Sequence, residues 1–452
     1  MSEHIRTAVR ELMPQAHDEL AALVGFESVA DEQVAPRSEC RAAARFVADL
    51  FADLGLEVEE LETSDGSVTV RGSAPAPDGA PTVLLYSHYD VQPAGDADAW
   101  TDSPWTLVER EGRWYGRGSA DCKGNLIMLV TALRALPRPW PVGITMICDG
   151  SEEMSTGGLE NLVQERPSLF AADLMLIADA GNIEAGIPTA TTMLRGTGSV
   201  LVTVRTLEGP VHSGMFGGAA PDALGALVHI LASLRDSTGD TVVNGLDTTG
   251  RWAGADYPEE RFRKDAGLLP GAPVLGSGSI SDTLWARPAA TILAIDAPAV
   301  GQATAAVQGE ARALINLRVP PGQDAAEAQR LLIEHLRDAA PWGVDVEVEP
   351  RTLGQPFAGR TDGPGFAALA AAMEESFGVP LTTVGQGGAI PLCSRLHEAH
   401  PEAEILLFGV EEPACRIHSP GESVSPEEIE RTAYGLAILL ASLGPSPATI
   451  AK

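Results

Sequence analysis

Acidic residues and histidines gather in five short segments of the 452-residue chain, and the first four of these follow apolar runs. The segments are Ser87-His88-Tyr89-Asp90, Ala120-Asp121-Cys122-Lys123-Gly124, Ser151-Glu152-Glu153-Met154, Ile177-Ala178-Asp179 and, near the C-terminus, Ile417-His418-Ser419. Imidazole nitrogens and carboxylate oxygens are the ligands of divalent cations in hydrolytic two-metal sites. One pair of cations explains all five segments, whereas without metal each would need its own explanation.

His88 and Asp90 come just after the strand-like run Thr82–Tyr86. In an extended segment, residues two apart point to the same side. Asp90 can therefore accept the second N–H of the His88 imidazole and fix the tautomer of a metal-bound ring. Taken alone, the same residues could instead cap a turn.

Asp121 precedes an expected helix, where a lone aspartate often serves as the N-cap, but its two oxygens are also able to bridge two cations. Glu152 and Glu153 follow the apolar strand Ile144–Cys148, and adjacent carboxylates repel each other unless a positive charge lies nearby. Because neighbouring side chains diverge, one can bind a cation while the other faces a water. An exposed acidic turn is the alternative.

Asp179 ends the buried run Leu174–Ala178, where an unpaired charge would be costly. His418 follows Arg416 and Ile417, and its alternative is an ordinary surface histidine. We interpret both as members of the same metal site.

The elements that must position these residues alternate between strands and helices. The helix Asn125–Leu136 lies within a series of strand-like runs, which are Val68–Arg71, Thr82–Tyr86, Gly143–Cys148 and Leu174–Ala178. This alternation predicts an α/β fold with a mixed, largely parallel sheet flanked by helices. Ligands in such sheets lie at the carboxyl ends of the strands, where the candidate residues stand.

After Asp179 the pattern changes, and it returns from Phe366 onward. The intervening elements are a strand 201–205, a helix 223–234, strands 303–308 and 311–319, a helix 324–336 and a strand 344–348. This order predicts an inserted ferredoxin-like α+β domain. We therefore expect a catalytic domain at 1–187 and 355–452, interrupted by a lid or dimerisation domain at 188–354; the stretch 237–293 has no assigned structure.

The amino-acid composition argues against some classes of binding partner and favours one cellular compartment. The chain has 62 acidic and 31 basic residues and a net charge of −31, which argues against nucleic acid or an anionic membrane as a partner. It contains no apolar run long enough to span a bilayer and no signal-peptide pattern at its N-terminus. Five scattered cysteines without a CxxC pair favour a reducing, cytoplasmic location.

Several of these segments also carry a family resemblance. LYSHYDVQP at 85–93, GRGSADCKG at 116–124 and the pair Glu152-Glu153 resemble signature blocks of the carnosinase-type cytosolic dipeptidases. These belong to a wider metallopeptidase group with the aminoacylases, acetylornithine deacetylases and glutamate carboxypeptidases. The likeness covers almost the whole chain, and HYDVQP together with HSGMFGG at 212–218 favours the dipeptidase branch over the deacylases.

The resemblance implies two divalent cations and a set of five ligands, with Asp121 as the bridge between them. The other four ligands are His88 and Asp179 for one cation, and Glu153 and His418 for the other. Glu152 would be the general base, and Asp90 would orient the metal-bound histidine.

The resemblance also implies residues that bind the substrate. His212 would reach from the inserted domain of a partner subunit to the scissile carbonyl, and Arg318 would hold the free carboxylate of the substrate. Gly388 and Ala389 lie in a loop that is usually GGSIP in the family. Ala389 replaces the serine of that motif, so backbone N–H groups would have to serve in place of its hydroxyl.

We therefore expect a dinuclear metallopeptidase that cleaves dipeptides or short peptides with a free C-terminal carboxylate, and a homodimer formed through the inserted domain. Zinc is the first expectation for the metal, with manganese or cobalt as alternatives, because imidazole and carboxylate suit all three. The alternatives for function are an N-acyl amino acid amidohydrolase of the same fold and, more distantly, a non-catalytic metal-bound peptide-binding protein. A serine hydrolase is disfavoured because the chain lacks a G-x-S-x-G motif.

Overall fold

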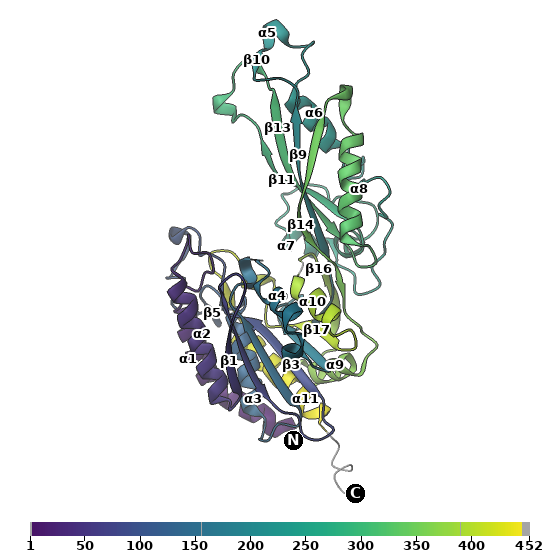
Figure 1. The fold of residues 1–452 in the computed structure, drawn as a ribbon. Helices are drawn as coiled ribbons and strands as arrows, with labels where there is room; N and C mark the ends of the chain where they lie inside the picture. The colour runs from purple at the N-terminus through teal and green to yellow at the C-terminus, as the bar shows by residue number, and fades with distance from the viewer. Residues whose placement is uncertain (1, 155, 389, 445–452) are drawn as a thin grey trace. The chain divides into compact units, whose positions relative to one another are not determined.

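The structure is a computed structural model that describes residues 2–154, 156–388 and 390–444. The predicted loop residue Ala389 therefore lies outside the described residues. The chain divides into two compact units (Figure 1). The first comprises Met1–Thr192, Gly359–Val384 and Pro391–Lys452, and the second comprises Met193–Ala358 and Gly385–Ile390.

A mixed sheet forms the centre of the first unit. Its strands follow the order β1 (Glu57–Glu62), β2 (Val68–Ala74), β6 (Gly143–Asp149), β3 (Thr82–His88), β7 (Leu174–Ala178), β17 (Glu404–Phe408), β8 (Thr189–Leu194) and β15 (Phe357–Ala358), with β16 (Thr382–Gln386) paired to β8. The four neighbours β6, β3, β7 and β17 are mutually parallel. The pairs toward β1 and β15 are antiparallel. Strands β6 and β7 are buried along their whole length, as expected where helices cover a parallel sheet.

Helices pack on this sheet through one large apolar core. The contributing helices are α1 (Ser2–Val24), α2 (Arg37–Asp53), α3 (Lys123–Ala135), α9 (Pro364–Phe377) and α11 (Pro426–Leu443). Nearly every residue of α3 is buried, which is typical of a helix packed on all sides. Two further helices, α4 (Gly158–Glu165) and α10 (Pro391–Ala399), contact each other. The predicted α/β class is confirmed.

A small antiparallel sheet joins the C-terminal segment to the region before Asp121. It consists of β4 (Val108–Arg110), β5 (Arg113–Tyr115) and β18 (Ser423–Val424). Because β18 pairs with β5, the chain that carries His418 is held beside the chain that leads to Asp121.

The second unit has a four-stranded antiparallel sheet in the order β11 (Ala289–Asp296), β13 (Glu310–Val319), β9 (Gly196–Arg205) and β14 (Val346–Gly354). Helices α6 (Ala223–Ala232) and α8 (Ala325–Asp338) share an apolar core with it. This arrangement confirms the predicted ferredoxin-like fold. Shorter elements are α5 (Ser213–Phe216), α7 (Glu259–Asp265) and the pair β10 (Val211–His212) and β12 (Ala306–Val307).

One predicted strand of this unit was wrong. The sequence predicted a strand at 303–308, but the second strand of the sheet is β11, which lies partly in the stretch without an assigned structure. Only Ala306–Val307 is extended within 303–308, and it pairs with β10 instead. Strand β11 is an edge strand that is exposed over most of its length, so it lacks the alternating pattern of a half-buried strand.

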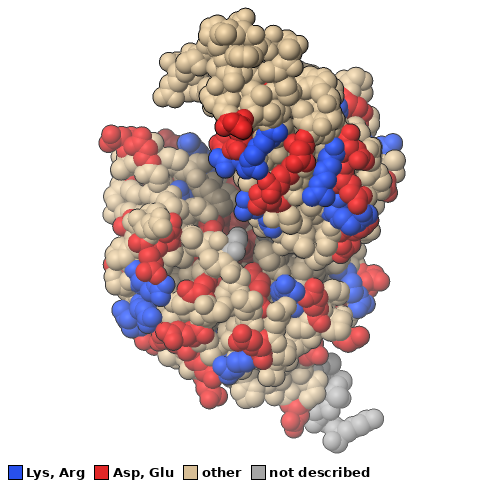
Figure 2. Space-filling model, turned by 45° about the horizontal axis from the view of Figure 1, so that its top comes forward, with Lys and Arg blue, Asp and Glu red and all other residues tan. Residues whose placement is uncertain are grey.

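Acidic and basic side chains are interspersed on the face shown in Figure 2. The excess of acidic residues is therefore not gathered there into a block of one sign. Among the described residues, no helix combines the length and the apolar character needed to cross a membrane.

Candidate metal centre

The candidate ligands converge at the edge of the first unit where the parallel strands end. His88 is the last residue of β3, and Asp179 directly follows β7. Glu153 lies in the turn after β6, and Asp121 stands two residues before α3 begins. His418 comes from the loop between Cys415 and β18, so the five residues reach one place from distant parts of the sequence.

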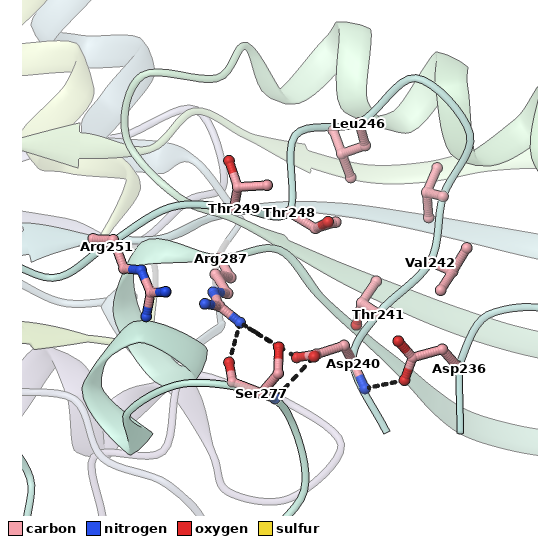
Figure 3. Close-up of a pocket in the computed structure, with 11 residues that line it drawn as sticks. Asp236, Asp240, Thr241, Val242, Leu246, Thr248, Thr249, Arg251, Ser277 and Arg287 are labelled. Atoms are coloured by element: carbon pink, nitrogen blue, oxygen red, sulfur yellow. Dashed lines mark hydrogen bonds and ion pairs between the residues drawn. The ribbon is translucent and has the colours of Figure 1, made fainter. Parts of the chain in front are cut away.

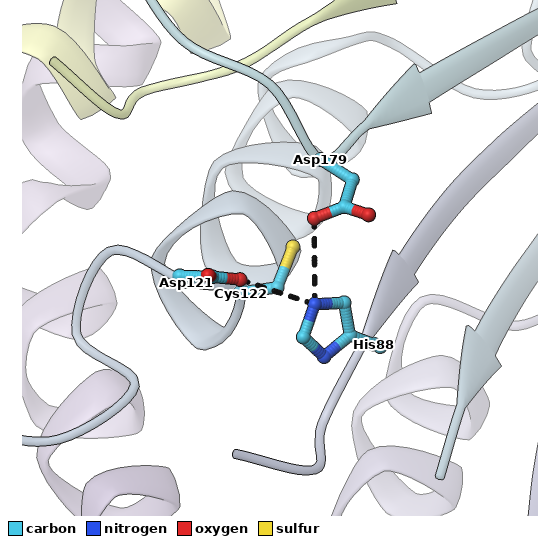
Figure 4. A group of neighbouring side chains, drawn as sticks. All are labelled: His88, Asp121, Cys122 and Asp179. Atoms are coloured by element: carbon cyan, nitrogen blue, oxygen red, sulfur yellow. Dashed lines mark hydrogen bonds and ion pairs between the residues drawn. The ribbon is translucent and has the colours of Figure 1, made fainter. Parts of the chain in front are cut away.

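The first group of side chains comprises His88, Asp121 and Asp179 (Figure 4). Nε2 of His88 lies 3.2 Å from Oδ1 of Asp121 and 3.4 Å from Oδ1 of Asp179. The His88 ring is fully buried, and both carboxylates are about nine-tenths buried. Three potential ligand atoms therefore face one another in a water-poor environment.

The second group comprises Asp121, Glu153 and His418. Nε2 of His418 lies 2.9 Å from Oδ2 of Asp121 and 3.1 Å from Oε1 of Glu153. Oε1 of Glu153 is buried and lacks a well-oriented hydrogen-bond donor among the described residues. Its other oxygen accepts a hydrogen bond from Nε2 of Gln92 at 3.0 Å.

These two groups fit a pair of cations. Two ligand atoms that bind one zinc ion at about 2.1 Å in tetrahedral geometry lie about 3.4 Å apart. The observed separations of 2.9–3.4 Å are close to that value. Asp121 presents one oxygen to each histidine, which is the arrangement of a bridging carboxylate. The buried, poorly satisfied oxygen of Glu153 also needs a positive partner.

Asp90 connects the first group to the glutamate turn. Its carboxylate is fully buried, and Oδ1 lies 3.3 Å from Nδ1 of His88. Nδ1 also lies 3.0 Å from the backbone oxygen of Asp90. The two carboxylate oxygens accept hydrogen bonds from the backbone N–H groups of Glu152 at 3.2 Å and Glu153 at 3.1 Å. Asp90 therefore orients a candidate ligand and the adjacent turn together.

The pKa values of the two histidines show that the clustered carboxylates favour positive charge beside them. Burial opposes protonation of His88, but the charge of Asp179 and the hydrogen bonds to Asp121 and Asp179 outweigh it and raise the pKa of the ring well above its usual value. The adjacent carboxylates of Asp121 and Glu153 raise the pKa of His418 to about 10. Without a cation, protons on the two histidines neutralise the carboxylates.

Glu152 stands beside these groups and has a different environment. Its carboxylate has no hydrogen-bond partner among the described residues. Burial, reinforced by the negative charge of Asp179, raises the pKa of Glu152 well above its usual value. A carboxyl group of this kind can both accept and return a proton.

Cys122 is a neighbour that sequence reasoning did not include among the ligands, although it is next to Asp121. Its sulfur lies close to the first group (Figure 4) and donates to the backbone oxygen of Ala178 at 3.0 Å. Burial raises the pKa of the Cys122 thiol to about 12. The side chain therefore lies beside the carboxylates as a neutral thiol.

Glu422 is a second residue that sequence reasoning missed. This fully buried carboxylate accepts hydrogen bonds from the backbone N–H groups of Ala120 at 3.2 Å and Asp121 at 3.1 Å. It also pairs with the buried Arg117 at 2.5 Å. Glu422 lies four residues after His418, so it ties together the two loops that supply ligands to the second group. The only sequence signal was an acid near a candidate histidine.

The predicted substrate residues belong to the second unit. His212 ends β10 and is exposed, and its Nδ1 accepts a hydrogen bond from the backbone N–H of Gly214 at 3.1 Å. Arg318 lies on β13 and is partly buried. Gly388 lies in the segment that follows β16. None of the three takes part in the two ligand groups.

Comparison with known proteins finds one matching family and several proteins of similar sequence. Residues 84–442 match the model of peptidase family M20/M25/M40. The cysteinylglycine-S-conjugate dipeptidase of Corynebacterium striatum is 45% identical over 408 residues, which cover 89% of this chain and 90% of the relative. The Beta-Ala-His dipeptidase of Homo sapiens is 28% identical, over 78% of this chain and 72% of the relative.

Solved structures share the same fold. Dipeptidase Dug1p from Saccharomyces cerevisiae superposes with a TM-score of 0.82 at 22% identity, covering 99% of both chains. Human carnosine dipeptidase 1 gives a TM-score of 0.80 at 24% identity, covering 98% of both chains. With the family match over most of the sequence and two clusters of side chains that could hold metal ions, this chain belongs to peptidase family M20/M25/M40 and is a metallopeptidase.

Proposed function

We propose that this protein is a dinuclear metal-dependent dipeptidase, which hydrolyses dipeptides or short peptides with a free C-terminal carboxylate. The observation that carries the proposal is Asp121, whose two oxygens face His88 on one side and His418 on the other. The name of the relative from Corynebacterium striatum, which is similar over nearly its whole length, supports dipeptides as the substrate class.

Five residues would hold the metals: His88, Asp121 and Asp179 for one cation, and Asp121, Glu153 and His418 for the other. When bound, the cations supply Lewis-acid chemistry that polarises the scissile carbonyl and lowers the pKa of water. Zinc is our first proposal for both positions, with manganese or cobalt as alternatives, because the donor set suits all three.

Glu152 is the proposed general base. Its carboxylate is free of hydrogen bonds to the described residues, so its lone pairs are available to a water molecule. It would take the proton of the attacking water and return it to the leaving amine. Its raised pKa suits the second of these steps, because a weakly acidic carboxyl group holds the proton until the amine forms.

Asp90 would keep the neutral tautomer of His88 correctly oriented and hold the Glu152 turn in place. In the second unit, Arg318 would bind the substrate carboxylate, with backbone groups around Gly388 and Ala389 assisting. His212 would donate to the developing oxyanion from a partner subunit.

We further propose that residues 188–354 form a lid and dimerisation domain inserted between catalytic segments 1–187 and 355–452. The exposed edge strand β11 supports a homodimer, because it carries the apolar side chains Ile292, Leu293 and Ile295 at 43%, 57% and 45% exposure. A cytoplasmic location is supported by the five cysteines, all of them free and buried.

A substrate panel with controlled metal content tests the proposal. Metal-stripped protein is reconstituted with zinc, manganese or cobalt and assayed on Cys-Gly, an S-substituted Cys-Gly, Ala-Ala and carnosine, and on N-acetyl amino acids. We expect hydrolysis of dipeptides that is lost on stripping and restored by metal. Activity on N-acetyl amino acids alone would establish the amidohydrolase alternative, and a metal-loaded protein without any hydrolytic activity would refute the proposal.

A further inference from the structure

Two buried arginines of this chain, Arg117 and Arg287, have hydrogen-bond or ion-pair partners for their guanidinium groups. Arg117 pairs with Glu422, as described above. In the second unit, Arg287 lines a cavity of about 410 Å³ (Figure 3). Its guanidinium donates to the backbone oxygen of Gly250 at 3.1 Å and lies 3.6 Å from Oδ1 of Asp240. Each of these charges has partners that explain its burial.

Arg195 is different. It lies between β8 and β9 and is only 8% exposed, yet its Nε and Nη1 have no hydrogen-bond partner among the described residues. Its backbone N–H donates to the backbone oxygen of Gln386 at 3.1 Å. A Cβ at position 387 would lie 2.8 Å from Nη2 of Arg195, which is too close for an ordinary contact. Glycine at this position avoids the clash with the guanidinium. A buried cation without acceptors is costly unless a ligand supplies them.

A second arginine lies on the same face of the sheet. Arg318 pairs in register with Thr197, and Arg195 precedes Thr197 by two residues. Directly opposed residues and residues two apart share a face, so both arginines point to the same side. The opposite side carries Gly198, where a Cβ would contact Gln329 of α8 at 3.1 Å. The arginines therefore lie on the face that α8 does not cover.

The electrostatics of this face are unusual for such an acidic chain. Burial, together with the positive charge of Arg318, lowers the pKa of Arg195 to about 10. Neither arginine forms an ion pair with an acid among the described residues, although the chain contains 62 acidic residues. Two neighbouring guanidinium groups that have no carboxylate partner among the described residues can bind an anion between them.

We infer that Arg195 and Arg318 together bind the C-terminal carboxylate of the substrate, and that Arg195 determines the preference for free acids. This inference rests on the function proposed above and adds a residue to it. A planar guanidinium matches the geometry of a carboxylate, and two of them hold it from two directions. A dipeptide acid would therefore bind far better than the same dipeptide with a C-terminal amide.

Kinetics on matched substrates test this role. Metal-loaded wild type and the variants Arg195→Met and Arg195→Lys are compared on Ala-Ala and on Ala-Ala amide. Arg195→Met should lower kcat/KM for the acid by roughly 10- to 100-fold, mainly through KM, and change the value for the amide by less than about threefold. Arg195→Lys should fall between, because it keeps the charge and loses the planar fork.

Arg205→Met is the matched control. Arg205 ends β9, the strand that begins directly after Arg195, but it is exposed and pairs with Glu310 at 2.7 Å and Glu347 at 2.8 Å. This variant should keep wild-type preference for the acid. Equal losses on acid and amide in Arg195→Met, or no loss on either, would overturn the inference.

Thermal unfolding separates binding from a structural role. Since Nε and Nη1 of Arg195 have no acceptor in the described part of the chain, Arg195→Met should unfold at the wild-type temperature or higher without ligand. It should also lose the stabilisation that Ala-Ala gives the metal-free wild type. A lower unfolding temperature with Ala-Ala stabilisation intact would show a structural role and refute the inference. If wild type cleaves no dipeptide, the proposed function fails, but this binding comparison still decides the role of Arg195.

Discussion

Replacing Asp90 with asparagine removes one negative charge and keeps the shape of the side chain. In the wild type, the two oxygens of Asp90 accept from the backbone N–H groups of Glu152 and Glu153, and one also lies 3.3 Å from Nδ1 of His88. An asparagine has one oxygen and one NH2 group. However the amide is turned, its NH2 group faces a backbone N–H that then has no acceptor.

The cost follows from these contacts. A buried donor left without an acceptor costs about 1–3 kcal/mol, which we expect as lower stability of Asp90→Asn. The charge that orients the His88 ring is lost as well, and loss of such a partner lowers metal affinity by roughly 10- to 100-fold. Because the Glu152 turn loosens at the same time, turnover at saturating metal should also fall.

Calorimetric metal titration and kinetics at saturating metal measure both effects. Asp149→Asn is the matched control, because Asp149 is also a buried acid at a strand end and accepts from the backbone N–H of Gly150 at 2.8 Å and from Thr69 at 3.0 Å. It contacts none of the candidate ligands through its carboxylate within the described chain. Unchanged metal affinity and turnover in Asp90→Asn would refute the orienting role.

Two further predictions concern the base and the histidines. Glu152→Gln should keep both metals, as measured by elemental analysis, and lower kcat by about 10²- to 10⁴-fold, and full activity would exclude Glu152 as the base. Metal affinity should rise with pH between about pH 6 and about pH 9, because the pKa of His418 in the metal-free protein is raised to about 10 and a cation must displace that proton. Titrations at several pH values would contradict this prediction if affinity were constant or fell.

The strands that carry the candidate ligands could be predicted from the sequence, because each apolar run and the polar residues at its end are neighbours in the chain. The apolar runs that became β3, β6 and β7 end next to His88, the Glu152 turn and Asp179. Carboxyl ends of parallel strands share one edge of a sheet, so proximity of these residues followed from the order of elements. His418 was a candidate ligand by its residue type, but no such rule places its loop at this edge of the sheet.

Residues that act through long-range contacts were not predictable in this way. Glu422 became noticeable only when its carboxylate was found between the backbone of Asp121 and the guanidinium of Arg117. Arg195 became noticeable only because two of its buried nitrogens have no acceptor among the residues that the structure describes. Strand β11 was missed because an exposed edge strand has no burial pattern to detect.

The sequence by itself determined the fold class, the family and the types of ligand, because apolar periodicity and short motifs are properties of neighbouring residues. Only the tertiary structure decided that Asp121 faces two histidines and that Arg195 lies near Arg318 with no acidic partner in the described chain. Electrostatic energies depend on distance and burial in space, and a linear sequence contains neither.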